Sequence, residues 1–204
     1  MANTVNPTKA NLLAAKKSLA FSKSGYELLD RKRNILVRET VAFTDTAKQL
    51  QAQMYTAFQK AYQALRLANI TLGDCNTFAQ AVPVDTSLTF RSRSVMGVEI
   101  PMLSLPAPQK ENFYGFAASN SYLDEAFFQF QKAKELAVRL AQIENSVYRL
   151  ATAISKTGKR ANALKNIVIP RYEQQIAHIN EVLEEKDLEE HSRLKVIKKQ
   201  KTKE

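Results

Sequence analysis

The sequence is poor in the residues from which most catalytic and metal sites are built. Its 204 residues include one cysteine, Cys75, two histidines, His178 and His191, and no tryptophan. A single cysteine excludes an internal disulfide and a cysteine-based zinc site, and two histidines are too few for most metal or acid–base sites. We therefore expect no catalytic residue, no metal site and no cofactor.

The motifs of common nucleotide-binding and hydrolytic enzymes are also missing. The only Gly-Lys pair, Gly158-Lys159, is followed by Arg160 and lacks the earlier glycine of a phosphate-binding loop. No dinucleotide-binding turn, zinc-protease motif or nucleophile elbow occurs. The acidic residues between Glu181 and Glu190 are typical of a solvated helix face. The sequence gives little support to an enzyme with an active site of its own.

Long hydrophobic runs are lacking too. No apolar run approaches the roughly 20 residues that span a bilayer, and Met1–Lys9 lacks the hydrophobic region of a signal peptide. Apolar residues make up 45% of the chain, and 30 Lys and Arg against 20 Asp and Glu give a formal net charge of +10. We expect a soluble, cytoplasmic, basic protein without direct membrane insertion.

The few glycines and prolines divide the chain into three parts. Four of the six prolines lie between Val82 and Phe116, whereas the flanking segments are almost free of helix breakers. This predicts a long N-terminal helix over 8–78, a β-hairpin and connector region over 79–119, and a long C-terminal helix over 120–200. The three parts together are expected to form one elongated unit.

Apolar residues recur at alternating three- and four-residue steps in both long segments, and we call these positions the seam. The predicted seam consists of Leu12, Ala15, Leu19, Ser22, Tyr26, Leu29, Arg33, Leu36, Thr40, Phe43, Ala47, Leu50, Met54, Ala57, Ala61, Ala64 and Ala68, and of Ala133, Leu136, Leu140, Ile143, Val147, Leu150, Ile154, Thr157, Ala161, Leu164 and Val168. A seven-residue repeat of this length indicates a left-handed coiled coil. The fold class is therefore mainly α, a long antiparallel two-helix left-handed coiled coil with a short β-hairpin region at its closed end.

The seam becomes irregular near Pro170. It continues as Tyr172, Ile176, Ile179 and Leu183, with a four-residue step where a three-residue step is due. Because proline removes a backbone donor, we expect a bend at this point. The proline is either simply tolerated in a long helix or marks a change of curvature.

A second apolar stripe accompanies the seam of the first helix. It consists of Tyr55, Phe58, Tyr62, Leu65 and Leu72. The antiparallel register that we expect places Ala57 near Ala141 and Tyr26 near Tyr172, so small residues face each other beside this stripe. The stripe fits either a broad core or a surface on which a partner docks.

Between Thr86 and Leu105 the pattern changes to alternation. Leu88, Phe90, Val98, Ile100 and Met102 alternate with polar or small residues. This predicts two short strands, and Met96-Gly97 is suited to the turn between them.

Basic residues gather at both ends of the chain. An antiparallel fold brings them to one tip and concentrates positive potential there. The residues assigned to this tip are Lys9, Lys16, Lys17, Lys195, Lys198 and Lys199. The tip suits an acidic protein collar, although a basic nucleic-acid-binding protein is an alternative; aromatic residues for base stacking are not interleaved with these lysines.

Five stretches of the sequence resemble the D subunits of V/A-type (vacuolar-type) rotary ATPases. They are Asn6–Leu13, Gly25–Arg33, Val95–Pro101, Lys159–Leu164 and Val168–Arg171. The stretches resemble the N-terminal, central and C-terminal motifs of that family and follow in the same order along the whole chain.

The resemblance implies a non-catalytic central-stalk rotor, peripheral to the membrane. Its partners would be the A and B subunits of the catalytic ring, the F subunit, and a socket subunit (C/d) above the membrane rotor ring, with no nucleic acid. We assign Tyr55, Phe58, Tyr62 and Leu65 to the F subunit as a hypothesis. The transported ion, H+ or Na+, and the direction of coupling stay open, and the alternative function is a basic coiled-coil scaffold or nucleic-acid-binding protein.

Overall fold

The computed structural model describes residues 6–106, 114–115 and 119–201. The elements follow in the order α1 (Lys9–Leu72), α2 (Asn76–Ala81), β1 (Thr89–Val95), β2 (Val98–Ser104), α3 (Ser121–Ala163), η2 (Leu164–Val168) and α4 (Ile169–Lys201). The chain divides into two compact units, one of Met1–Asn34 with Ser155–Glu204 and one of Ile35–Ile154. We call them the terminal unit and the central unit.

Local sequence signals fix both ends of α1. The Thr8 hydroxyl accepts a hydrogen bond from the Asn11 backbone N–H at 3.2 Å, which is the contact of a helix N-cap. At the other end, Gly73 has a φ of 83° and donates its N–H to the Asn69 carbonyl at 3.0 Å. A glycine in this left-handed conformation ends the helix because it has no Cβ to clash.

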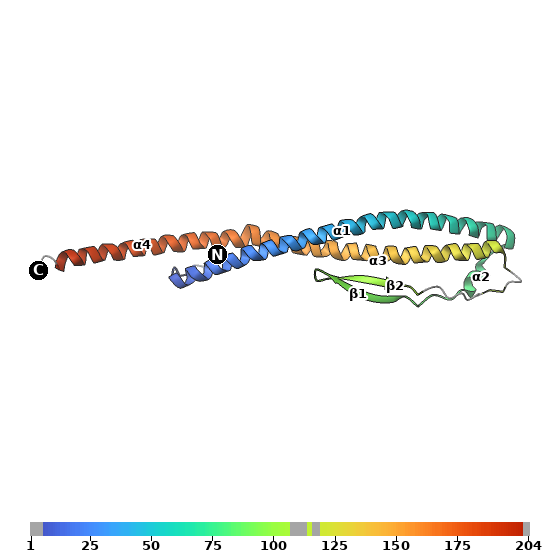
Figure 1. Cartoon of the computed structure of the whole chain (residues 1–204), viewed down its shortest axis with the longest axis horizontal. Coiled ribbons are helices and arrows are strands. Elements are labelled where there is room, and N and C mark those ends of the chain that lie inside the picture. Colours follow the sequence, from blue (N-terminus) through green and yellow to red (C-terminus); the bar gives the residue numbers. More distant parts are fainter. Residues whose placement is uncertain (1–5, 107–113, 116–118, 202–204) are drawn as a thin grey trace. The chain divides into compact units, whose positions relative to one another are not determined.

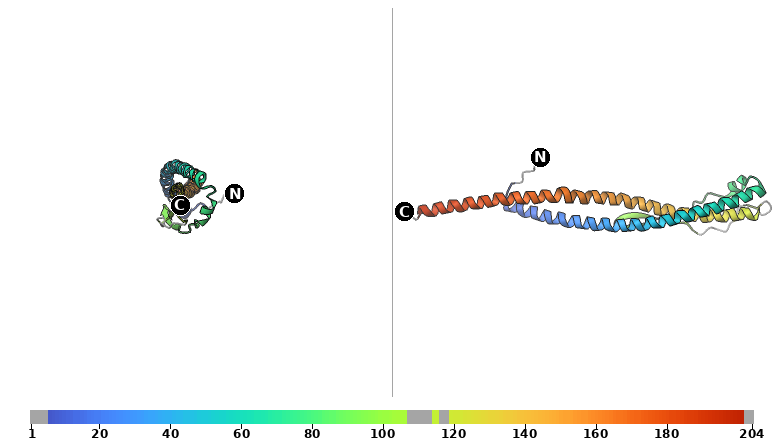
Figure 2. Two further views of the ribbon diagram at one scale, coloured as in Figure 1. Left: turned by 90° about the vertical axis from the view of Figure 1, so that its right-hand side faces the viewer. Right: turned by 90° about the horizontal axis from the view of Figure 1, so that it is seen from above.

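In the terminal unit, the first part of α1 and α4 lie antiparallel and side by side (Figure 2). Lys9 pairs with Asp187 at 3.8 Å, and Lys23 pairs with Glu173 at 2.8 Å. Residue numbers on α4 therefore fall as those on α1 rise, as in an antiparallel pair. The buried residues of this unit are Ala15, Ser22, Thr157, Ala161 and Ile179. All five lie on the predicted seam.

In the central unit, the rest of α1 packs antiparallel to α3. The side chain of Gln51 donates to Glu144 at 3.3 Å, and that of Asn120 donates to Thr71 at 3.2 Å. The expected register is therefore wrong in detail, because Asn120 precedes the expected partner of Thr71 by seven residues. The buried residues shared with the predicted seam are Leu36, Ala61, Ala64, Ala68, Ala133, Leu140 and Leu150.

The hairpin β1–β2 runs back along the helices of the central unit, beside α3 (Figure 1). Its strands are antiparallel, with Val95 opposite Val98 and Thr89 opposite Ser104. Ile100 is buried with Leu36 and Leu150 in one core cluster. The hairpin therefore packs against both long helices.

A second core cluster lies where α1 connects to α3. Ala68, Cys75 and Leu123 are its buried residues, and Phe78 and Tyr114 pack against it. The rings of Phe78 and Tyr114 meet edge to face at 6.1 Å. The segment that includes α2 is thereby fixed to the helix ends by apolar contacts.

The predicted fold class is confirmed in its main features. Long helices dominate, they pack against each other antiparallel, and the middle of the chain forms a short antiparallel hairpin. The expected position of the hairpin at the closed end is wrong, because Ile100 packs against Leu36 and Leu150, which lie far along α1 and α3 from the connection between these helices (Figure 1). None of the helices in the described ranges combines the length and apolar character needed to cross a bilayer.

Candidate functional site

The described residues contain no group of three or more His, Cys, Asp or Glu side chains that could hold a metal ion. Cys75 is buried in the apolar cluster at the end of α1, which is the environment of a packing residue. Every buried side-chain nitrogen or oxygen among the described residues has a hydrogen-bond partner. The candidate sites described below are surfaces.

The aromatic stripe on α1 is partly core and partly surface. The ring of Tyr62 stacks on Phe58, with 6.2 Å between centroids, and meets the edge of Phe130 from α3 at 5.4 Å. Leu65 packs against the cluster of Ala68, Cys75 and Leu123. Tyr55 and Tyr62, in contrast, are 66% and 60% exposed. The stripe thus combines core packing with two accessible tyrosines.

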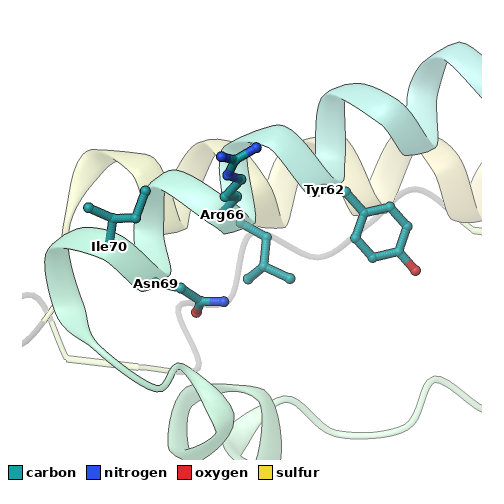
Figure 3. A pocket seen from close by; sticks show the side chains of 5 residues that line it. Tyr62, Arg66, Asn69 and Ile70 are labelled. Atoms are coloured by element: carbon teal, nitrogen blue, oxygen red, sulfur yellow. The ribbon is translucent and has the colours of Figure 1, made fainter.

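A shallow hollow continues this stripe toward the end of α1 (Figure 3). It is lined by Tyr62, Leu65, Arg66, Asn69 and Ile70. Ile70 is 71% exposed, which is high for an isoleucine. Arg66, Asn69 and Ile70 were not predicted from the sequence, although the four-residue spacing of Tyr62, Arg66 and Ile70 places these three on one helix face.

The basic residues at the chain ends occupy different levels of the terminal unit. Lys9 pairs with Asp187, whereas Lys195 lies about two turns further along α4. Every residue described after Leu183 is exposed, so this last part of α4 buries no side chain against the described part of α1. Lys16 and Lys17 lie exposed on α1.

Apolar side chains accompany the lysines on the last part of α4. Leu194, Val196 and Ile197 are 63%, 56% and 50% exposed. The predicted tip residues Lys195, Lys198 and Lys199 are exposed on the same turns. This helix end is therefore both basic and apolar, and only its charge was predicted from the sequence.

The irregular seam near Pro170 coincides with a π-helical turn. The Ile169 N–H donates to the Leu164 carbonyl, five residues back instead of four. A π-turn inserts one extra residue into an α-helix. The seam also has one extra residue here, because a four-residue step replaces a three-residue step. Nearby, the Lys165 ammonium lies 5.8 Å from the centre of the Tyr26 ring. The predicted neighbour of Tyr26 was Tyr172, about two turns further along.

The turn of the hairpin is formed by Met96 and Gly97, with φ angles of 51° and 75°. Three polar contacts fix the hairpin and its approach segment to α3. The Arg149 guanidinium donates to the Glu99 carbonyl at 3.2 Å, the Leu103 N–H donates to the Gln142 side chain at 2.9 Å, and the Lys134 ammonium pairs with Asp85.

Two carboxylates stabilise the segments on either side of the hairpin. The hydrogen bond from Lys134, followed by those from Ser87, holds the pKa of Asp85 well below its usual value. The Tyr114 hydroxyl donates to Asp124 near the start of α3 at 2.7 Å. Partial burial, together with this bond, raises the pKa of Tyr114 above its usual value of 10.0. Both contacts are structural.

Comparison with known proteins gives a match over almost the whole chain. The family model for the D subunit of ATP synthases matches residues 11–199. The D subunit of the V-type ATP synthase of Thermotoga neapolitana is 41% identical over 197 residues, which cover 96% of this chain and 97% of the relative. The D subunit of the A-type ATP synthase of Pyrococcus furiosus is 35% identical over 199 residues (95% and 93%), and that of Methanosphaera stadtmanae is 34% identical over 200 residues (96% and 94%).

Proposed function

Because the chain belongs to the family of ATP synthase D subunits, as the match over residues 11–199 shows, we propose that it is the central-stalk rotor of a V/A-type rotary ATPase. In this role it couples ATP hydrolysis or synthesis in the ring of A and B subunits to H+ or Na+ transport. Any member of this family is part of a multi-subunit complex, and the family fits a non-catalytic role. The family match is the observation that carries the proposal.

A rotor transmits work if it resists twisting and offers a different side to each catalytic interface. Antiparallel pairing of α1 with α3 and α4 supports the first property, because packed seam residues such as Leu36 and Leu150 oppose sliding. Two helices of different sequence support the second. Each A–B interface would meet a different surface and be biased toward an open or closed state by the difference in contact energy.

We assign the end that carries the chain termini to the inside of the A/B ring. Its proposed contact residues are Lys9, Lys16, Lys17, Lys195, Lys198 and Lys199. Exposed ion pairs contribute only about 0–1 kcal/mol each, so such contacts can form and break as the rotor turns. Lys9 pairs with Asp187 in the isolated chain, so a ring contact of Lys9 would have to compete with this exposed ion pair.

The end of the central unit where α1 connects to α3 is assigned to the socket subunit (C/d) above the membrane rotor ring. The protein would then act at the cytoplasmic side of the membrane as a peripheral part of the complex. Pro170 and the adjacent π-turn would adapt the course of the helix within the terminal unit.

The F subunit is assigned to the face formed by Tyr55, Phe58, Tyr62 and Leu65. The exposure of Tyr55 and Tyr62 supports this assignment, because large exposed aromatic side chains are typical of partner contacts. The hollow beside Tyr62 extends the same face.

The proposal is tested by reconstitution of the complex from purified subunits. The wild-type chain should co-purify with A, B and F, and the double variant Phe58→Ala, Tyr62→Ala should keep A and B but lose F. Loss of a few aromatic anchors typically costs about 2 kcal/mol or more each at an interface. Exposed Phe21, replaced by alanine, is the control.

Unchanged binding of F by the double variant would reject the face, while failure of the wild-type chain to join A and B would reject the function. The alternative of a nucleic-acid-binding scaffold predicts salt-dependent retention on DNA instead.

A further inference from the structure

The two edges of the hairpin differ in how their backbone groups are satisfied. Met96 and Gly97 form a two-residue turn with positive φ, so the flanking pair Val95 and Val98 is hydrogen-bonded. Hydrogen-bonded and non-hydrogen-bonded pairs then alternate along the strands. The backbone groups that point outward are therefore those of Phe90, Ser92 and Ser94 in β1, and of Glu99, Pro101 and Leu103 in β2.

The outer edge of β2 is occupied by α3. The Glu99 carbonyl accepts from Arg149, and the Leu103 N–H donates to Gln142. Between them lies Pro101, which has no N–H to satisfy. Glu99 and Leu103 bond to α3 and Pro101 needs no partner, as expected if these three residues of β2 point outward from the hairpin. The contacts therefore support the alternation of hydrogen-bonded and non-hydrogen-bonded pairs independently of the turn geometry.

The outer edge of β1 is open. Thr89–Ser94 are all exposed. The outward backbone N–H groups of Phe90, Ser92 and Ser94 have no hydrogen-bond partner among the residues that the structure describes. An open strand edge of this kind is a template on which another extended segment can pair.

The side chains of β1 define what such a segment must carry. Arg91 and Arg93 lie on one face of the strand, are exposed, and form no ion pair within the described ranges. On the other face Phe90 is 72% exposed and lies opposite Leu103. An added strand with acidic residues on the first face and an apolar residue beside Phe90 would satisfy both faces.

A second copy of this chain is a poor occupant. Antiparallel pairing of two β1 strands about Ser92 would place Arg91 of one copy opposite Arg93 of the other, twice. Like charges directly opposite each other destabilise a strand pair. The partner must therefore have the opposite charge.

We propose that the β1 edge binds an extended acidic segment of another subunit, which adds a third strand to the hairpin. The proposal rests on the proposed function in that the segment belongs to the same complex. Backbone hydrogen bonds to Phe90, Ser92 and Ser94 would supply affinity, and Arg91 and Arg93 would select for acidic side chains.

Amide hydrogen exchange of the isolated chain and of the complex reconstituted with A, B, F and the socket subunit tests this directly. The amides of Phe90, Ser92 and Ser94 should exchange freely in the isolated chain and about tenfold or more slowly in the complex. The amides of Arg91 and Arg93 bond to β2 and should be protected in both samples. Equal exchange of the outward amides in both samples would overturn the proposal.

Two variants separate the contributions of charge and backbone. Arg91→Glu with Arg93→Glu should abolish the added protection, whereas Arg91→Lys with Arg93→Lys should keep it. Ser92→Pro removes one outward N–H at an edge position that tolerates proline, and it should reduce protection at Phe90 and Ser94. Unchanged exchange of Arg91 and Arg93 in the isolated Ser92→Pro variant would show that its hairpin is intact.

The remaining outcomes are distinguishable. Protection that survives the glutamate substitutions would reject an acidic partner. Protection that rises with the concentration of the isolated chain would indicate pairing between copies and also overturn the proposal. Failure of the wild-type chain to assemble with A and B would instead overturn the proposed function.

Discussion

At the scale of single residues, the central unit depends on small side chains. Ala61, Ala68 and Ala133 are fully buried, and Ala64 is nearly so. Methyl groups bury little apolar area, at about 25 cal/mol per Å2, so their value lies in allowing close helix packing. The contact of Tyr62 with Phe130 adds apolar area beside them.

The first prediction concerns this close packing. Replacing Ala61 with leucine should lower the free energy of unfolding by about 1–3 kcal/mol, because the larger side chain has no space to enter. The measurement is urea unfolding of the full chain. Ala52→Leu is the matched control, because Ala52 is exposed on the same helix. Equal stability of the two variants would contradict the packing described for Ala61.

Asp85 provides a residue-scale prediction about pH. The bond from Lys134 lowers its folded-state pKa below the unfolded value of 3.8. Its stabilising contribution is therefore present above pH 3.8 and is lost as the pH falls through the lower folded-state pKa.

The Ser87 amide reports this titration, because its N–H donates to the Asp85 carboxylate at 2.9 Å. Its NMR chemical shift should change with a midpoint below pH 3.8, and Lys134→Ala should move the midpoint upward. A midpoint at or above pH 3.8 in the wild-type chain would be inconsistent with the ion pair.

At the scale of elements, the π-turn Leu164–Val168 explains how the terminal unit keeps its seam. The extra residue in the repeat would otherwise rotate the following apolar positions by about 100° away from α1. The wide turn absorbs that residue, and Ile179 is buried as a result. Pro170 lies two residues beyond the turn, close to the point where the regular α-helical bonding is interrupted.

Deleting one residue of the turn tests this explanation. Deletion of exposed Ile167 together with Pro170→Ala should give a regular α-helix with nearly wild-type stability. Deletion of Ile167 alone should cost about 3 kcal/mol, because Pro170 would then lie within a regular helix. Thermal unfolding followed by circular dichroism measures both.

The control is deletion of Lys156, which is exposed in a regular part of the seam. It should destabilise the protein by more than the double change does, since nothing there absorbs a missing residue. If the Lys156 deletion and the double variant unfold at the same temperature, the π-turn has no role in the register.

The heptad pattern predicted most of the buried helix residues but not their partners, and it missed the buried residues Leu123, Ala126 and Ser146 of α3. A seam that repeats every seven residues looks the same when one helix slides by seven, which is the offset between the expected and observed partners of Thr71. Gln142 and Arg149 fix the hairpin, yet they lie 39 and 50 residues from Leu103 and Glu99. Contacts between such distant positions leave no local pattern to read.

The candidate surfaces were predicted in a similarly partial way. Spacing identified Tyr55 and Tyr62, because exposed aromatic residues outside a seam stand out in a sequence. Ile70 and the open edge of β1 were missed, since their exposure depends on what α3 covers. The irregular step near Pro170 could be read from the sequence. That a π-turn accommodates it could be seen only from the backbone hydrogen bonds of the structure.

At the scale of the whole molecule, the proposal requires that one chain connect a catalytic ring to a membrane rotor. Basic and apolar side chains on the last part of α4 suit contact with a surrounding ring. The central unit contains three of the candidate surfaces, namely the aromatic stripe on α1, the hollow at Ile70 and the open edge of β1. Contacts of the terminal unit would then transmit force from ATP hydrolysis, and contacts of the central unit would fix further subunits.

The central claim is that this chain turns when the A/B ring hydrolyses ATP. A cysteine introduced at Val84, which is 89% exposed, in a Cys75→Ala background can carry a bead while the ring is fixed to a surface. The account predicts that ATP drives the bead through repeated full turns in one direction. A bead that stays still, or only fluctuates, while the same complexes hydrolyse ATP would contradict it.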